Sequence, residues 1–269
     1  MSKSKGNTVL PSEIIKKYSA DILRMWAAEK SLGKDIPYKE EDLKEGRNFL
    51  TKLWNASRFV DGFLVDYSND AEQSFSTMDK WMLQRLDDVI NKCTDHFENL
   101  RYDLVKKEVT NFFHHDFCDN YLEIAKNRLY SDSDPKLKAG AKYVLKRTLE
   151  DSLKLLAPIV PHITEELYHK VFAKTEDESI HNSAWPTASK IEFSPELDNL
   201  GNLTIETISY LRTWKNQNNL RLCEPIEELN LTHPNAEELL KVVDILQDTL
   251  RIKKLNIVSG KTIILARNN

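Results

Sequence analysis

Residues 40–65 read EEDLKEGRNFLTKLWNASRFVDGFLV, and this stretch decides the fold. Apolar or small side chains recur along it at steps of three and four, at Leu43, Phe49, Leu50, Leu53, Ser57, Val60 and Leu64. Such steps place side chains on one face of an α-helix. The stretch therefore predicts a long amphipathic helix with one face turned toward a core.

The neighbouring segments show the same period. Helical spacing also predicts, in chain order, helices at residues 11–17, 20–30, 78–99, 102–129, 135–156 and 162–173. Helices that are joined by short connections pack as antiparallel neighbours. We therefore predict a mainly α chain that is built on an antiparallel helical bundle.

The end of the chain has a different pattern. Residues 174–194 are polar, and beyond them helical and alternating stretches succeed one another: helices at 195–218 and 235–250, strands at 226–232, 254–258 and 262–266. This order predicts a small α+β domain. The expected domains are 1–38 (a leading loop and connecting helices), 39–189 (the helical domain) and 190–269 (the α+β domain).

Charge and composition exclude several classes of protein. The 269 residues carry a formal net charge of −4, although residues 1–60 hold twelve basic and eight acidic side chains. This net charge excludes binding of nucleic acid through an overall positive charge, whereas it does not exclude binding by a local positive patch near the N-terminus. Three scattered cysteines are typical of reduced cytosolic thiols. No run approaches the roughly 20 apolar residues of a membrane helix, so we expect a cytoplasmic protein with no membrane partner.

The first seven residues, MSKSKGN, form a polar loop with two lysines, two serines and a glycine. Such a loop suits a polyphosphate, because lysine neutralises phosphate charge while hydroxyls and amides position the oxygens. Taken by themselves, these residues favour a polar chain terminus that has no site.

A second candidate site lies on the long helix, away from its apolar face. Lys52, Asn55 and Phe59 share one side there, and Arg47 and Arg58 flank them. Unpaired bases are recognised by aromatic stacking, by hydrogen bonds to their edges and by neutralised phosphates. The trio offers one side chain for each task, although a solvated helix face with Phe59 covering a neighbouring helix would show the same pattern.

Several motifs together resemble a known family. MSKSKGN looks like the signature loop of class I aminoacyl-tRNA synthetases without its leading lysine, and residues 14–24 resemble the segment that follows that loop. Four further stretches look specifically like the valyl branch: residues 47–59, 116–123, 156–168 and 184–186. Their order and spacing hold over nearly the whole chain. Residues 33–37 and 50–54 resemble the archaeal type.

The resemblance implies a C-terminal portion of a valyl-tRNA synthetase: the end of the signature loop, the anticodon-binding helices and a small appended domain. Lys3, with Ser2 and Ser4, would contact ATP in the intact enzyme, which uses ATP with magnesium to join valine to its tRNA. Lys52, Asn55 and Phe59 would face the anticodon. The catalytic domain would precede residue 1, so we expect this portion alone to be an inactive monomer that binds valine tRNA and needs no cofactor or metal.

Two other readings stay open at this stage. The isoleucyl branch shares the architecture, and a helical protein-interaction scaffold without RNA binding would show the same periodicity. A metal or nucleophile cluster at His114, His115, Asp116 and Cys118 is not expected, because adjacent helical positions point in different directions. Lys215 and its basic neighbours read as a solvated helix end, with contact to tRNA as the alternative.

Overall fold

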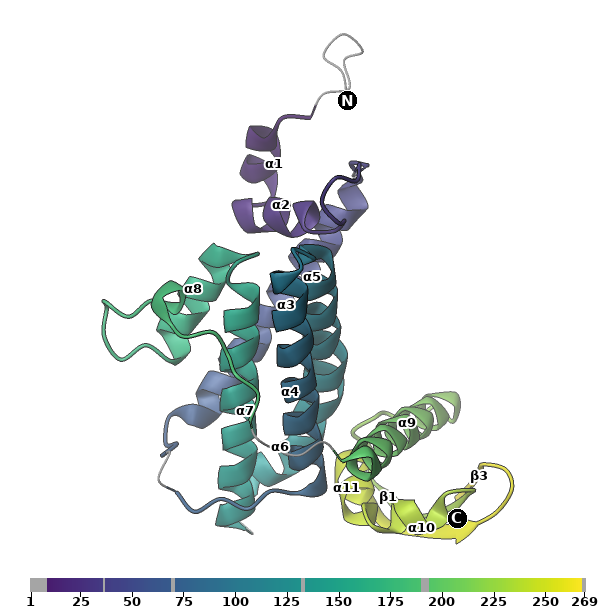
Figure 1. Cartoon of the computed structure of the whole chain (residues 1–269). Coiled ribbons are helices and arrows are strands. Elements are labelled where there is room, and N and C mark those ends of the chain that lie inside the picture. The colour runs from purple at the N-terminus through teal and green to yellow at the C-terminus, as the bar shows by residue number, and fades with distance from the viewer. Residues whose placement is uncertain (1–8, 36, 69–70, 132–133, 190–193, 268–269) are drawn as a thin grey trace. The chain divides into compact units, whose positions relative to one another are not determined.

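The computed structural model describes residues 9–35, 37–68, 71–131, 134–189 and 194–267. Contacts group the described residues into two compact units, one within 1–69, 85–118 and 142–191 and the other within 70–84, 119–141 and 192–269. The helices predicted from the sequence are present. They are α1 (Pro11–Lys17), α2 (Ala20–Ala27), α3 (Glu40–Leu64), α4 (Thr77–Glu98), α5 (Tyr102–Asn111), η2 (Phe112–Tyr121), α6 (Leu122–Tyr130), α7 (Pro135–Leu156), α8 (Pro161–Val171) and α9 (Pro195–Gln217) (Figure 1). A short 3₁₀ helix, η3 (Ile180–Asn182), was not predicted.

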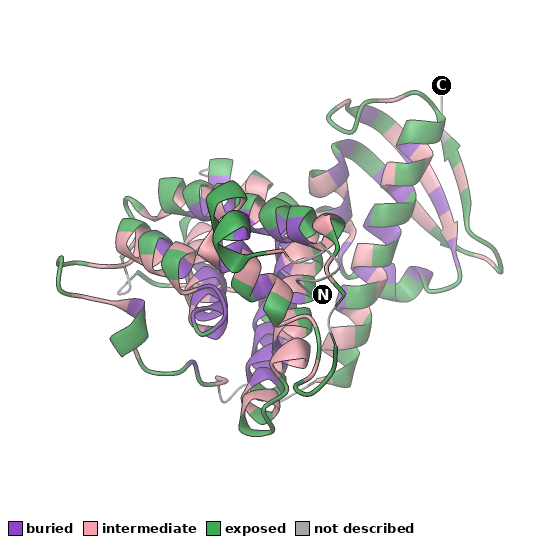
Figure 2. Cartoon of the chain, turned by 90° about the horizontal axis from the view of Figure 1, so that it is seen from above, coloured by how far each residue is buried: buried purple, intermediate pink, exposed green. Residues whose placement is uncertain are grey.

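Helix α3 forms where its spacing predicts, and its apolar face enters the core of the first unit. Of the seven residues that define the pattern, Leu64 is half-buried and the others are buried. The ring of Phe49 meets that of Phe113 edge-on, with 6.1 Å between centroids. In Figure 2 the buried residues gather toward the middle of the bundle. Burial of this continuous face is the main source of the helix's stability.

Helix α2 is fastened to the start of α8 by two side chains. The buried Asp21 carboxylate accepts hydrogen bonds from the backbone N–H groups of His162 (3.3 Å) and Ile163 (2.7 Å). Arg24 donates to the carbonyls of Pro158 and Ile159 at 2.8 and 2.9 Å. Asp21 thus satisfies N–H groups in the first turn of α8, which would otherwise lack partners. The segment after the leading loop is therefore anchored to the helical unit.

The predicted helix at 102–129 is interrupted by a change of helix type. Between α5 and α6 the backbone runs as a π-helix, η2, in which each N–H bonds five residues back instead of four. The rings of Phe113 and Phe117 are buried on its inner side, 5.3 Å apart. The wider turn changes which side chains become neighbours, and this matters for the histidines described below.

The second unit contains the predicted α+β fold. Its sheet has the order β2-β1-β3, with β1 (Ile226–His233) parallel to β2 (Ile252–Ser259) and antiparallel to β3 (Ile264–Arg267). The expected single helix at 235–250 is divided into α10 (Ala236–Leu240) and α11 (Val243–Leu250). Helices α10 and α11 pack against β2 and α9. The fold class predicted from the sequence is confirmed.

The predicted domain boundary at 189/190 touches residues outside the described ranges, and the three expected domains stay predictions. None of the described helices combines the length and the apolar character that a membrane crossing needs.

Candidate nucleic-acid interface

Three chemically different side chains lie close together on the outer side of α3. At about 100° per residue, Lys52, Asn55 and Phe59 fall within an arc of about 60°. Asn55 is exposed, whereas Lys52 and Phe59 are half-buried at the border of the apolar face. The structure therefore brings together the three residues that the sequence singled out.

Phe59 is braced by a second aromatic ring one turn further on. The centroid of Phe63 lies 5.0 Å from that of Phe59, with 59° between the ring planes. Tyr67 follows after another four residues, and the ammonium group of Lys146 lies 5.7 Å from its ring centroid. These neighbours were not predicted from the sequence, although the three rings recur there at steps of four. The contact with Phe63 restricts the ring of Phe59 and leaves it partly accessible.

The two flanking arginines occupy different places. Arg58 is exposed beside the trio, about 100° around the helix from Phe59. Arg47 lies twelve residues before Phe59, about 18 Å along the axis, and its guanidinium sits 5.4 Å from the ring centroid of Tyr18. The structure does not bring Arg47 to the trio.

Near Arg47, the carboxylate of Glu40 organises the start of α3. It accepts hydrogen bonds from the Lys17 ammonium (2.5 Å) and the Tyr18 hydroxyl (2.7 Å). These bonds, that from Lys17 first, lower the pKa of Glu40 to about 2. The same bond raises the pKa of Lys17. The N-terminal end of α3 therefore presents a fixed polar group beside Arg47.

Two other predictions concern charged side chains elsewhere. Ser2, Lys3 and Ser4 lie outside the described residues. Lys215 is 1% exposed, and its ammonium donates to three backbone carbonyls, those of Leu222 (3.2 Å), Glu224 (2.7 Å) and Leu250 (2.7 Å). Burial lowers its pKa. The interpretation of Lys215 as part of a solvated helix end is therefore wrong: the side chain joins segments of the second unit, and its ammonium group is buried away from solvent.

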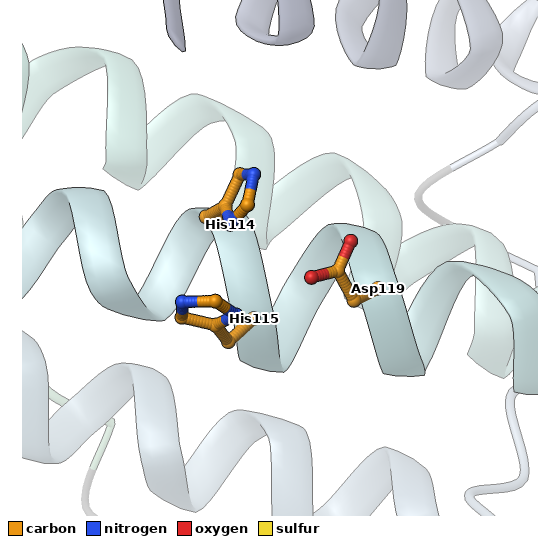
Figure 3. A group of neighbouring side chains, drawn as sticks. All are labelled: His114, His115 and Asp119. Atoms are coloured by element: carbon orange, nitrogen blue, oxygen red, sulfur yellow. The ribbon is translucent and has the colours of Figure 1, made fainter. Parts of the chain in front are cut away.

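The histidine pair on η2 is arranged differently from the expectation. One ligand atom each from His114, His115 and Asp119 lie within 4.8 Å of one another (Figure 3). Asp116 instead accepts two hydrogen bonds from Arg85, at 3.0 and 3.2 Å. The expectation that these side chains diverge holds for an α-helix, whereas η2 is a π-helix with a wider turn.

Comparison with known proteins places this geometry in a family. A family profile described as "Anticodon-binding domain of tRNA ligase" matches residues 79–230, and one described as "tRNA synthetases class I (I, L, M and V)" matches residues 1–39. The valine–tRNA ligase of Methanothermobacter thermautotrophicus is 35% identical over 99% of this chain and 30% of its own length. That of Pyrococcus furiosus is 37% identical over 97% and 30%, and that of a Wolbachia species 40% over 89% and 28%.

These matches confirm the resemblance to the valyl branch, with archaeal enzymes among the relatives. The chain spans about 30% of the length of the curated relatives that it matches.

Solved structures agree on the fold. A leucyl-tRNA synthetase of Agrobacterium radiobacter, in a ternary complex with tRNA, superposes with a TM-score of 0.55 at 15% identity, over 97% of this chain and 31% of that one. The methionyl-tRNA synthetase of Mycobacterium tuberculosis gives 0.54 at 19% identity, over 72% and 40%. Because the first profile covers more than half of the residues, the chain belongs to the family of anticodon-binding domains of tRNA ligases.

Proposed function

We propose that this chain is the tRNA-recognition portion of a valine–tRNA ligase and that it reads the anticodon with the outer side of α3. The observation that carries the proposal is the arc of Lys52, Asn55 and Phe59, in which a cation, an amide and a partly accessible ring adjoin one another. Membership of the anticodon-binding family and the identity to valine–tRNA ligases support it.

Each side chain has a distinct task in this proposal. The ring of Phe59 stacks on an unpaired base, and its contact with Phe63 reduces the entropy lost on binding. The Asn55 amide both donates and accepts, so it can pair with a base edge. The Lys52 ammonium neutralises a phosphate or donates to a base acceptor. Arg58 adds charge to the adjoining face, whereas Arg47 would reach only a more distant part of the RNA.

The activity of the whole enzyme is part of the proposal. In it, valine is joined to its tRNA with ATP and magnesium, and Lys3, Ser2 and Ser4 contact the ATP phosphates. The elements of the described residues are helices and one three-stranded sheet, and they include no nucleotide-binding parallel sheet. We therefore expect the chain alone, a cytoplasmic monomer, to give no valine-dependent exchange of pyrophosphate into ATP. Exchange above the no-enzyme background would contradict this expectation.

The recognition proposal is tested by binding at one fixed, moderate salt concentration, because phosphate contacts make affinity salt-dependent. The RNAs are a valine tRNA transcript, the same transcript with its anticodon replaced, and an isoleucine tRNA. The proteins are wild type, Phe59→Ala, Phe59→Tyr and Tyr210→Ala. Tyr210 is a matched control because it is an aromatic residue on α9 with 41% of its surface exposed.

The wild-type protein should prefer the native valine anticodon, and Phe59→Ala should weaken that complex by roughly tenfold, which is within the range for loss of one stacked base. Phe59→Tyr and Tyr210→Ala should retain the preference. Equal binding of all three RNAs would leave only non-specific electrostatic contact. Preference for isoleucine tRNA would favour the isoleucyl branch, and absence of binding would favour a protein-interaction scaffold.

A further inference from the structure

The π-helix η2 brings two imidazoles to one carboxylate, whereas an α-helix would place only His115 beside Asp119. In an α-helix the neighbours on the next turn are three and four residues away. The wider turn of a π-helix, with its five-residue hydrogen bonds, favours neighbours four and five residues away. Asp119 lies four residues after His115 and five after His114, so all three side chains meet on one side.

The arrangement comes close to the geometry that a small metal ion needs. Zinc binds imidazole nitrogens and carboxylate oxygens at about 2.0–2.2 Å, so its ligand atoms lie roughly 3.3 Å apart in a tetrahedral site. The three ligand atoms here lie within 4.8 Å of one another. The centroids of the two imidazole rings lie 4.7 Å apart, with 86° between the ring planes. Figure 3 shows all three side chains on one stretch of the helix.

A neighbouring cavity offers an approach and a place for water. His115 is exposed and lines a cavity of about 320 Å³ together with three carboxylates and one guanidinium, those of Asp88, Glu108, Asp116 and Arg85. Asp88 also pairs with Lys92 at 2.7 Å, and an excess of negative charge remains around the cavity. This charge attracts cations. The cavity can also hold the water molecule that completes a site with three protein ligands.

We propose that His114, His115 and Asp119 bind one divalent transition-metal ion of the zinc class. Two imidazoles and a carboxylate favour zinc and its neighbours over magnesium or calcium, which prefer oxygen ligands. The ion would replace the contacts that these side chains make with other groups and would hold the wide turn of η2 closed. The proposal is independent of RNA recognition, because none of its residues lies on α3.

The experiment uses the whole chain without a polyhistidine tag, freed of metal by a chelator and titrated with Zn²⁺ by calorimetry at pH 7.5. Wild type should bind one ion per chain, and the melting temperature should rise with Zn²⁺ because only the folded state holds the site. Bound Co²⁺ should give the visible absorption of a nitrogen- and oxygen-ligated ion.

The variants are His115→Ala and Asp119→Asn, with His181→Ala as the control. His181 is also exposed and also lies beside a carboxylate, that of Glu165. Each site variant should weaken Zn²⁺ binding by at least about tenfold and remove the rise in melting temperature, whereas the control should retain both. Circular dichroism checks that each variant is folded. Absence of one-to-one binding in wild type, or binding by His115→Ala that equals wild type, would overturn the proposal.

Discussion

A Cβ atom placed on Gly201 would lie 2.0 Å from Cδ1 of Trp81, so α9 packs onto the indole ring of α4 with no room for a methyl group. Trp81 is itself buried at 1% exposure and cannot move toward solvent without opening the core of the second unit. This close approach explains the glycine in the middle of α9, where a glycine otherwise costs helix stability.

We therefore predict that Gly201→Ala lowers the free energy of unfolding by about 1–3 kcal/mol, the usual cost of overpacking a core. Gly62→Ala is the matched control, because a Cβ there meets nothing within 4 Å and Gly62 is exposed on α3. The control should raise the free energy of unfolding by about 0.5–1 kcal/mol. Urea titrations of both variants provide the measurement, and equal stabilisation by the two alanines would contradict the packing described here.

The buried carboxylate of Asp79 supports a second prediction. Asp79 is 0% exposed and accepts hydrogen bonds from the Tyr121 hydroxyl (2.6 Å) and from two nitrogens of Arg128 (2.5 and 2.8 Å). It also caps α4 by accepting from the backbone N–H of Ser76 at 2.8 Å. Removing its charge would leave the mostly buried guanidinium without a counter-ion.

Asp79→Asn should therefore lower the free energy of unfolding by about 3–5 kcal/mol, the cost of breaking a buried ion pair from one side. Glu227→Gln breaks the exposed pair with Lys253, whose side chains are 76% and 65% exposed, and should change stability by less than about 1 kcal/mol. Denaturant titrations measure the free energy of unfolding of Asp79→Asn and of Glu227→Gln and so compare the buried pair with the exposed one. A small effect for Asp79→Asn would mean that Arg128 finds water or another partner.

The helices were predictable because the apolar residues that form each buried face recur along the chain at helical spacing. The predicted helix at 40–65 and the observed α3, Glu40–Leu64, differ by only one residue. The agreement is close because acidic residues mark the start of the helix and its apolar spacing continues to Leu64. Likewise, the alternation in 226–232 predicted β1 because one side of that strand faces the core.

Other features depend on contacts that spacing cannot reveal. The π-helix η2 lies inside a stretch whose apolar residues also fit an α-helix, so the meeting of His114 with Asp119, five residues apart, was not foreseen. Lys215 was misread because its three carbonyl acceptors lie 7, 9 and 35 residues further along the chain and meet the ammonium group only in the folded unit. In the candidate interface, the shared side of Lys52, Asn55 and Phe59 on α3 was predictable from their helical positions. The ring contact between Phe59 and Phe63 was not predicted.

His233 gives the second unit a pH dependence. It is 7% exposed, and its Nδ1 atom accepts a hydrogen bond from the backbone N–H of Asn235 at 3.0 Å, which requires a neutral ring. Burial lowers its pKa below the ordinary value of 6.5, and the nearby charge of Glu206 only partly opposes this. Between the lowered pKa and 6.5 the unfolded chain binds more protons than the folded one, so this contribution to stability falls as the pH falls.

We expect the melting temperature of wild type to fall more between pH 7 and pH 5.5 than that of His233→Asn. The asparagine carbonyl can accept the same hydrogen bond but does not titrate, so the difference between the two pH slopes isolates His233. The other histidines contribute equally to both proteins. Identical slopes would show that the ring is protonated as easily in the folded unit as in the unfolded chain.

The three cysteines should differ sharply in reactivity. Cys93 is buried on α4, and burial, with a smaller contribution from the charge of Glu108, raises its pKa to about 12. Cys118 is also buried, whereas Cys223 is exposed. Only the thiolate attacks a disulfide reagent, so exposure and pKa together set the rate.

At pH 8 an aromatic disulfide reagent should therefore modify one thiol quickly in the native protein and all three in denaturant. Cys223→Ser should remove the fast phase of modification, and Cys93→Ser should leave it unchanged. A fast phase that survives in Cys223→Ser would mean that a buried thiol becomes exposed by local opening of its helix.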